Sequence, residues 1–207
     1  MDRSVRAATD RCTTVFLEAM DDRLQFATTT TALGAFGVVW SEKGILRTWM
    51  HARTEEATRS RIRHAFPGAE PAEPPAAIAT AIADVVSLLE GEPRDLLAAE
   101  LEMSAMPAFD CRVYEVARLI APGATMTYGA VASALGVEPM RARDVGQALA
   151  RNPFAPIVPC HRVVGTGGRL GGYSAPGGTA TKRRLLVLEG AAIVASQGHQ
   201  AGFFDQI

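Results

Sequence analysis

A cysteine lies directly beside a histidine in this chain, and the pair is the first candidate for a nucleophile and its base. Cys160 and His161 follow a short apolar stretch inside the run Ile157–Val164. A thiol in positive surroundings is shifted toward the thiolate, the form that attacks electrophilic carbon. The same surroundings would hold a polyanion. The run therefore predicts a nucleophilic cysteine at a site that also binds nucleic acid.

Basic residues are concentrated around this pair, although the whole chain carries a net charge of only −1. The window from residue 140 to 184 contains eight arginines and lysines against Asp144 alone, so its charge is +7 and the remainder carries −8. A neutral protein with one basic face is typical of a DNA binder with a limited footprint. Arginines scattered over several faces would give the same count, so charge alone leaves both interpretations open.

The composition indicates an ordinary globular protein, with 48% hydrophobic and 21% charged residues among 207. No apolar run reaches the roughly 18 residues that a membrane span needs. Residues 1–11 lack an apolar signal core, so we expect a cytoplasmic protein with access to DNA. Three cysteines without a CxxC pair fit a reducing compartment and predict no structural zinc site. We expect no cofactor.

Residues 1–100 predict a small domain of β-sheet and helix, and the domain boundary is placed between residues 91 and 106. Turn residues, strand patterns and helical spacing of apolar residues mark its elements. These are expected to be strands at 13–18, 34–40 and 45–51, a hairpin turn at 41–44, a helix at 53–65, a proline-rich loop at 67–75 and a helix at 78–89.

Residues 101–192 predict a winged-helix-like domain, followed by a tail at 193–207, so the fold class is α+β. Two short helices, at 128–135 and about 140–151, are joined by a glycine-containing turn and have the shape of a helix-turn-helix. Thr127 would cap the first helix. The second would be the recognition helix, and it carries the candidate DNA-binding side chains Arg141, Arg143, Gln147 and Arg151.

Three further elements complete this domain. A helix is expected at residues 109–120, and a final helix at 180–189. Asn152-Pro153 ends the recognition helix, because a proline disfavours helical geometry at the preceding residue. Residues 154–158 are apolar and are expected to form a short buried strand that leads to Cys160. The glycine-rich loop at 165–173 lacks the spacing of a phosphate-binding loop.

Residues from about 109 to 191 resemble the catalytic domain of the O6-alkylguanine-DNA alkyltransferases. The order and spacing of short motifs over about eighty residues carry the resemblance, and Pro159–Val163 is the most specific of them. The matching pieces are Phe109 with Val113-Tyr114, Pro122-Gly123, Thr127-Tyr128-Gly129, Arg143 with Val145-Gly146, Asn152-Pro153, Ile157–Val164, Gly172-Tyr173-Ser174 and Lys182–Gly190.

The resemblance implies a direct repair reaction on double-stranded DNA. Cys160 would take a methyl or larger alkyl group from guanine O6, with thymine O4 as a second candidate position, and would not be regenerated. His161 would contact the cysteine through water and be oriented by Glu189, which is the nucleophile–base–orienter arrangement of hydrolases. The target nucleotide would be flipped out of the duplex to reach the thiol. The protein would act as a monomer.

The resemblance also implies roles for the residues that hold the base. Tyr128 would donate toward a ring nitrogen of guanine, while the Val163 backbone and Ser174 would bond its edge. Tyr173 would pack over the base. Arg143 would fill the gap in the base stack, and Asn152 would join the recognition helix to the active loop.

Four positions depart from the family pattern. Tyr114 and Asp110 stand where tryptophan and glutamine are common, which we interpret as changes in packing or capping. Asp144 replaces a commoner alanine beside Arg143. Ala155 stands where some relatives carry a proline that shapes the pocket.

Other classes of protein fit the sequence less well. A non-catalytic protein that recognises alkylated bases is the main alternative, but such proteins lack the cysteine. A small-molecule cysteine hydrolase would leave the helix-turn-helix and the arginines unexplained. A regulator of the adaptive response would need a four-cysteine zinc module, and this chain has three cysteines.

Overall fold

The computed structural model describes residues 23–192, so the strand expected at residues 13–18 lies outside the described residues. No helix in the described part of the chain is long and apolar enough to cross a membrane. The elements, in chain order, are β1 (Gln25–Thr31), β2 (Gly34–Ser41), β3 (Gly44–Ala52), α2 (Glu55–Ala65), β4 (Glu70–Pro71), α3 (Ala76–Leu89), α4 (Ala108–Arg118), β5 (Met126–Thr127), α5 (Tyr128–Ala134), η2 (Pro139–Arg141), α6 (Ala142–Ala150), η3 (Cys160–Arg162), β6 (Val163–Val164), η4 (Thr166–Gly168) and α7 (Gly178–Leu188).

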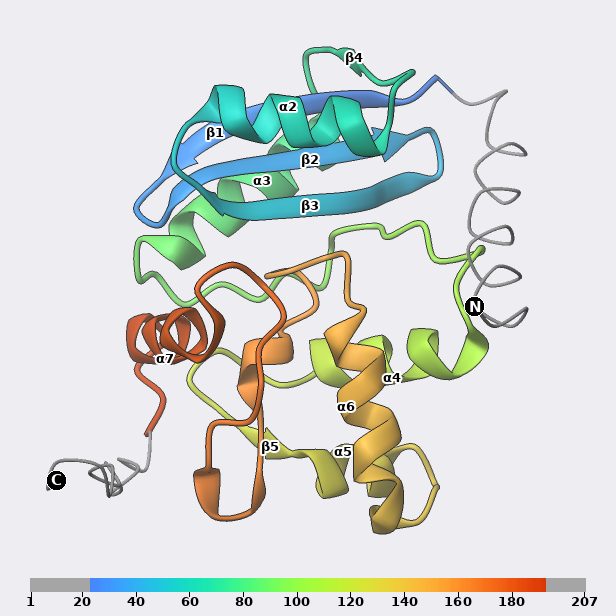
Figure 1. Cartoon of the computed structure of the whole chain (residues 1–207), viewed down its shortest axis with the longest axis vertical. Helices are drawn as coiled ribbons and strands as arrows, with labels where there is room; N and C mark the ends of the chain where they lie inside the picture. Colours follow the sequence, from blue (N-terminus) through green and yellow to red (C-terminus); the bar gives the residue numbers. More distant parts are fainter. Residues whose placement is uncertain (1–22, 193–207) are drawn as a thin grey trace, which may run out of the picture.

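The N-terminal half is a four-stranded sheet in the order β3-β2-β1-β4. β1, β2 and β3 pair antiparallel through tight turns, and β4 adds a short parallel edge to the start of β1. β2 is one of the two inner strands and is buried along almost its whole length, which fits its apolar sequence GAFGVVWS. β3 forms the edge of the sheet nearest to the second half of the chain (Figure 1).

Helices cover both faces of this sheet (Figure 1). α2 begins at Thr54, whose side chain accepts a hydrogen bond from the Ala57 amide, and it packs Ile62 with Phe66 against one face. Gly37 of β2 allows the close approach, because a Cβ there would lie 2.5 Å from Thr58 Cγ2. α3 packs against the opposite face and belongs to the main apolar core.

The second half consists of helices around a two-stranded parallel pair, β5 and β6. α5 and α6 are joined through the short 3-10 turn η2 and pack against one another and against α4. Thr127 caps α5 by accepting a hydrogen bond from the Ala130 amide at 3.1 Å, as the sequence predicts. β5 runs directly into α5 and β6 follows η3, so their pairing brings residue 128 next to the cysteine turn.

One apolar core runs through both halves and includes side chains from β2, α3, α4, α5, α6 and α7. The halves also share hydrogen bonds at the edge of β3. The Thr48 amide donates to the Pro153 carbonyl at 2.9 Å, and the Thr48 hydroxyl donates to the Ala155 carbonyl at 2.6 Å. The boundary near residue 100 stays a prediction, because the apolar core is continuous across it.

Most of the expected elements are confirmed, and the differences have physical reasons. The strand expected at 154–158 is wrong, because Asn152 accepts from the Phe154 amide and donates to the Val158 carbonyl and so folds the segment into turns. These residues are buried without pairing to a sheet. β1 was not expected, because four consecutive threonines hide the alternation of apolar and polar residues that marks a strand.

Thr48→Val should test the contact between the sheet and the turn at residues 153–155. Valine keeps the shape of the side chain but leaves the Ala155 carbonyl without this partner, so the free energy of unfolding should fall by about 1–2 kcal/mol. Urea denaturation measures this change. The matched control is Thr29→Val in β1, whose hydroxyl bonds to no described residue, and an equal loss in both variants would contradict the prediction.

Candidate active site

Cys160 opens the 3-10 turn η3 and is held by the turns before it. The Cys160 amide donates to the Val158 carbonyl at 2.8 Å, while the Asn152 side chain bonds the same carbonyl from the end of α6. The cysteine side chain is 7% exposed. Asn152 therefore joins the end of α6 to the cysteine turn.

His161 and Arg162 point into the protein and share a buried carboxylate. His161 Nε2 lies 2.8 Å from Glu189 Oε1, and Arg162 makes two hydrogen bonds to the same carboxylate at 2.9 and 3.0 Å. All three side chains are nearly fully buried. Glu189 follows the last residue of α7, so this cluster ties the final helix to the cysteine turn.

The electrostatics of this cluster leave the histidine neutral and the glutamate charged. Burial opposes ionisation of Glu189, but hydrogen bonds from His161 and Arg162 outweigh it and lower the pKa of Glu189 to about 2. Burial lowers the pKa of His161, although the bond to Glu189 partly opposes this. Because Nε2 faces the carboxylate, it carries the proton of the neutral ring. Nδ1 is then a buried acceptor without a hydrogen-bond partner among the described residues.

Cys160 is a thiol in the resting protein, contrary to the simple expectation from its basic neighbours. Burial raises the pKa of the thiol, and this outweighs the hydrogen bond from Asn152, the charge of Lys182 and the nearby Tyr173 hydroxyl, which all lower it. The resting pair is therefore an uncharged thiol beside an uncharged imidazole. Moving the thiol proton to His161 Nδ1 would create a thiolate that Lys182 stabilises.

Tyr128 and Lys182 lie close to each other and to Val163, the residue that follows the cysteine turn. The Tyr128 ring lies between α6 and the loop before residue 173, where a Cβ on Gly171 would come within 3.1 Å of the Tyr128 hydroxyl. Lys182 is fully buried, donates to the Val163 carbonyl at 2.6 Å and lies 3.4 Å from the Tyr128 hydroxyl. Burial lowers the pKa of Lys182 to about 8. The ammonium thus polarises both the tyrosine and the Val163 carbonyl.

A pocket of about 370 Å³ opens beside Cys160. Asn152 and Ser174 line it together with the cysteine, so the structure brings these three predicted residues together. The buried Tyr173 hydroxyl lies close to the thiol, and each group shifts the pKa of the other. Val163 lies at the back of the turn, where its amide bonds to the Cys160 carbonyl. Val163 is fully buried and does not line this pocket.

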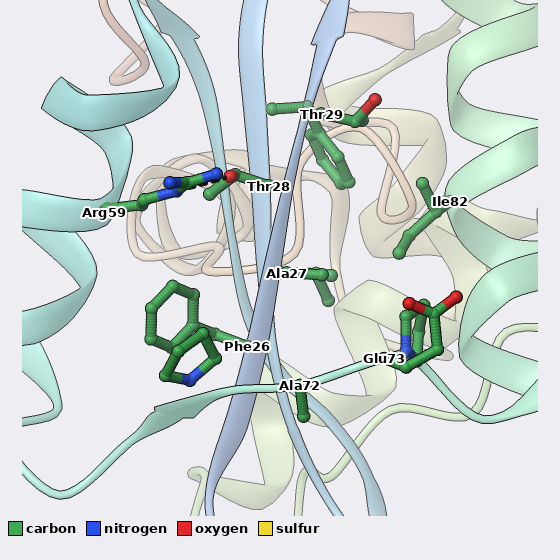
Figure 2. Close-up of a pocket in the computed structure, with 12 residues that line it drawn as sticks. Phe26, Ala27, Thr28, Thr29, Arg59, Ala72, Glu73 and Ile82 are labelled. Atoms are coloured by element: carbon green, nitrogen blue, oxygen red, sulfur yellow. Dashed lines mark hydrogen bonds between the residues drawn. The ribbon is translucent and has the colours of Figure 1, made fainter.

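A second pocket, of about 560 Å³, lies around β1 between α2 and α3 and shares no lining residue with the first. Figure 2 shows Arg59 and Thr28 on the α2 side of β1, with Ile82 on the other side. The Arg59 guanidinium bonds to Thr28 and to Glu55, so the polar groups on this side satisfy one another. No cysteine or histidine lines this pocket, and we place the chemistry at Cys160.

The four candidate DNA-binding side chains on α6 and its ends divide into two pairs. Arg143 and Gln147 are exposed on one face of α6. Arg141 instead bonds to Asp144 at 2.7 Å and stacks over the Phe109 ring at 5.2 Å. Arg151 makes a bidentate ion pair with Asp110, with both contacts at 2.9 Å. Asp110 is 2% exposed, so this pair anchors α6 to α4.

The exposed basic face is smaller than the number of arginines and lysines in residues 140–184 indicates. Arg162 and Lys182 are buried, and Arg151 is paired with a carboxylate. Tyr114, one of the departures from the family pattern, is a packing change: it is fully buried and donates to the Ala148 carbonyl of α6 at 3.0 Å. Together with Asp110, it fixes the position of α6 against α4.

Sequence reasoning missed two site residues, Lys182 and Arg162. Both were counted as surface charge. Helical spacing contains a signal for the lysine, because Lys182, Leu185, Leu186 and Glu189 recur at intervals that place them on one face of α7, and the first three are buried there. Arg162 offers no such signal, since its burial depends on a carboxylate 27 residues away.

Glu189→Gln should change how stability depends on pH. The folded-state pKa of about 2 lies below the ordinary value of 4.5, so the ionised carboxylate stabilises the fold above about pH 4.5, and this contribution disappears as the pH falls toward 2. The lost contribution is on the order of 3 kcal/mol. Urea midpoints between pH 2 and 6 should fall more steeply in the unmodified protein than in the variant. Glu115→Gln, on the exposed side of α4, should keep the steep fall, and equal slopes in all three proteins would refute this assignment.

Comparisons with known proteins identify the family. Residues 108–191 match the family model described as the DNA-binding domain of 6-O-methylguanine DNA methyltransferase. The methylated-DNA–protein-cysteine methyltransferase of Methanothermobacter thermautotrophicus is 31% identical over 76% of this chain and 80% of its own length. A DNA base-flipping protein of Thermus thermophilus is 38% identical over 63% of this chain and 87% of its own length.

A solved structure extends the similarity beyond the matched domain. The Mycobacterium tuberculosis OGT in complex with DNA superimposes with a TM-score of 0.61 at 31% sequence identity, over 80% of this chain and 92% of that one. The similarity therefore includes the N-terminal sheet as well as the helical half. This chain belongs to the family of methylated-DNA–protein-cysteine methyltransferases.

Proposed function

We propose that this protein repairs double-stranded DNA by moving an alkyl group from guanine O6 to Cys160, once per molecule. The observation that carries the proposal is the hydrogen-bonded pair of His161 and Glu189 behind a cysteine that opens into a pocket. Family membership supplies the substrate class. The N-terminal sheet domain (1–100), the catalytic domain (101–192) and the tail (193–207) are proposed as its parts.

The first step of the proposed mechanism is proton removal from the thiol. Glu189 holds the proton on His161 Nε2, which leaves Nδ1 as the acceptor, either directly or through a water molecule. The new thiolate lies near the Lys182 ammonium, which lowers its energy. Because the resting thiol is uncharged, the nucleophile would form only when a substrate is in place.

The second step is a single displacement. The Cys160 sulfur forms a bond to the alkyl carbon, the bond from that carbon to guanine O6 breaks, and its electron pair stays on the guanine. Tyr128, polarised by Lys182, donates toward a ring nitrogen and so stabilises the departing base. The proton on His161 balances the proton that the guanine finally takes up. A thioether does not hydrolyse readily, so Cys160 stays alkylated.

The flipped base would lie in the pocket beside the thiol. Ser174, which lines the pocket, and the Val163 backbone would bond its edge, and Tyr173 would pack over its face. Arg143 and Gln147 would face the DNA from α6, with Arg143 filling the gap left by the extruded nucleotide. Arg141 and Arg151 would contribute charge near the phosphates while holding α6 in place.

We also propose that the protein acts as a monomer in the cytoplasm and needs no cofactor. Nucleophile, base, orienting carboxylate and lysine all come from one chain, which supports a monomeric active unit. The alternative is a non-catalytic protein that recognises alkylated bases, a role suggested by the relative named as a base-flipping protein. The presence of Cys160 favours alkyl transfer over recognition alone.

Mass spectrometry after mixing the protein with a duplex containing one O6-methylguanine tests the reaction. We expect a gain of one methyl group on the peptide that contains Cys160, with a maximum of one per molecule, and no gain in Cys160→Ala. Cys111→Ala serves as the matched control and should react like the unmodified protein. Binding of the duplex without methylation would instead establish a recognition protein.

Arg143→Ala and Arg151→Ala should separate DNA distortion from structural anchoring. The first removes an exposed side chain, so stability should stay within about 0.5 kcal/mol, while transfer from duplex DNA should slow by at least about tenfold because an unstacked gap costs a few kcal/mol. The second leaves Asp110 buried without its partner, so stability should fall by about 1–3 kcal/mol. Single-turnover rates and urea denaturation measure both effects. The reverse result, in which Arg143→Ala loses stability and Arg151→Ala loses only transfer rate, would contradict these roles.

A further inference from the structure

The outer edge of β1 is only partly covered by the rest of the sheet. β4 pairs with β1 at Gln25 and Phe26, and it donates hydrogen bonds to the carbonyls of Leu24 and Phe26. Backbone groups of alternate residues in a strand point to opposite sides, so the amides and carbonyls of Thr28 and Thr30 face the same outer edge. Among the described residues, none makes a backbone hydrogen bond to these groups.

Prolines end β4 before it can cover this edge. Pro71 is the second residue of β4, and Pro74 and Pro75 follow before α3 begins. A proline has no amide hydrogen to donate and interrupts the hydrogen bonds of a sheet. An unpaired strand edge of this kind is a template for a further strand.

The pocket of about 560 Å³ lies along this open edge and has apolar groups on both faces of β1. Phe26 packs in the apolar cluster on the α2 side, whereas Ala27 and Ile82 pack against the main core on the α3 side. Figure 2 shows Phe26 and Ile82 on opposite sides of the strand. A strand that pairs with β1 here would therefore have both of its faces covered.

Residues 13–18, with the sequence TTVFLE, have the pattern that such a strand requires. Side chains alternate along a strand, so Val15 and Leu17 would project to one face and Phe16 to the other. Threonine, valine and phenylalanine all favour strands. A segment that is apolar on both faces fits an edge with apolar groups on both sides, and the open edge of β1 supplies the partner that this predicted strand needs.

The length of chain before β1 lets this segment reach the open edge. Residues 1–22 precede Arg23, and the Leu24 carbonyl already bonds to β4. The rise from residue 24 to Thr28 is about 13 Å at the spacing of a β-strand. Residues 19–23 can span up to about 17 Å when extended, so they can pass β4 and bring residue 18 beside Thr28.

We propose that residues 13–18 bind along the open edge of β1 as an added antiparallel strand, with Val15, Phe16 and Leu17 in the pocket. The sheet edge is then covered by the chain's own N-terminal segment. This pocket shares no lining residue with the pocket beside Cys160, so the proposal does not depend on the proposed function. A second copy of the chain is the rival occupant, and the test separates the two.

Amide hydrogen exchange of the full-length protein, measured residue by residue by NMR, tests the proposal. The Thr28 and Thr30 amides should exchange slowly, because residues 13–18 bond to them. Val15→Asp and Leu17→Asp each place a charge in the pocket and should speed this exchange by at least about tenfold.

The controls lie in the same two segments. Val5→Asp makes the same change outside residues 13–18 and should keep the slow exchange of the two edge amides. The Ala27 and Thr29 amides face β2 and should stay slow in every variant, which checks that the sheet remains folded. Rapid exchange of the edge amides in the unmodified protein, or slow exchange that both pocket variants keep, would overturn the proposal. Slow exchange that disappears on dilution together with a dimer in sedimentation would assign the edge to a second copy and would also overturn it.

Discussion

The buried carboxylate of Glu189 is the interaction on which the site depends. It fixes the tautomer of His161, neutralises Arg162 and joins the end of α7 to the turn that carries Cys160. A buried charge is tolerated only when it is paired and hydrogen-bonded, and here both oxygens are bonded. Without this carboxylate, an arginine and a histidine would be buried without their partner, and the helix and the cysteine turn would lose their connection.

Burial explains why Cys160, the proposed nucleophile, is uncharged at rest. Burial keeps both Cys160 and His161 uncharged, so the protein does not expose a thiolate to every electrophile. Lys182 remains nearby to stabilise the thiolate once the proton moves. In the proposed single-use reaction this arrangement is an advantage, because an accidental reaction would inactivate a whole molecule.

Position in the fold, rather than the number of charges, decides what each basic residue does. Of the eight in the window from 140 to 184, Arg162 and Lys182 build the site, Arg151 braces α6, and Arg143 stays exposed toward the proposed DNA face. The N-terminal sheet shows that residues outside this window can also reach the site. Its arginines lie far from Cys160 in the sequence, yet β3 carries Arg47 to the pocket through the bonds of Thr48.

The amino-acid sequence by itself determined the family and the helix-turn-helix and proposed Cys160 with His161 as the nucleophile and its base, because these depend on short motifs and on the spacing of apolar residues. It also predicted most helices and two strands of the sheet. Only the tertiary structure decided which charges are buried, why residues 154–158 turn instead of forming a strand, and which residues close the pocket. Such features depend on partners that are distant in the chain, such as Asp110 for Arg151 and Glu189 for Arg162. The local spacing of residues therefore cannot predict them.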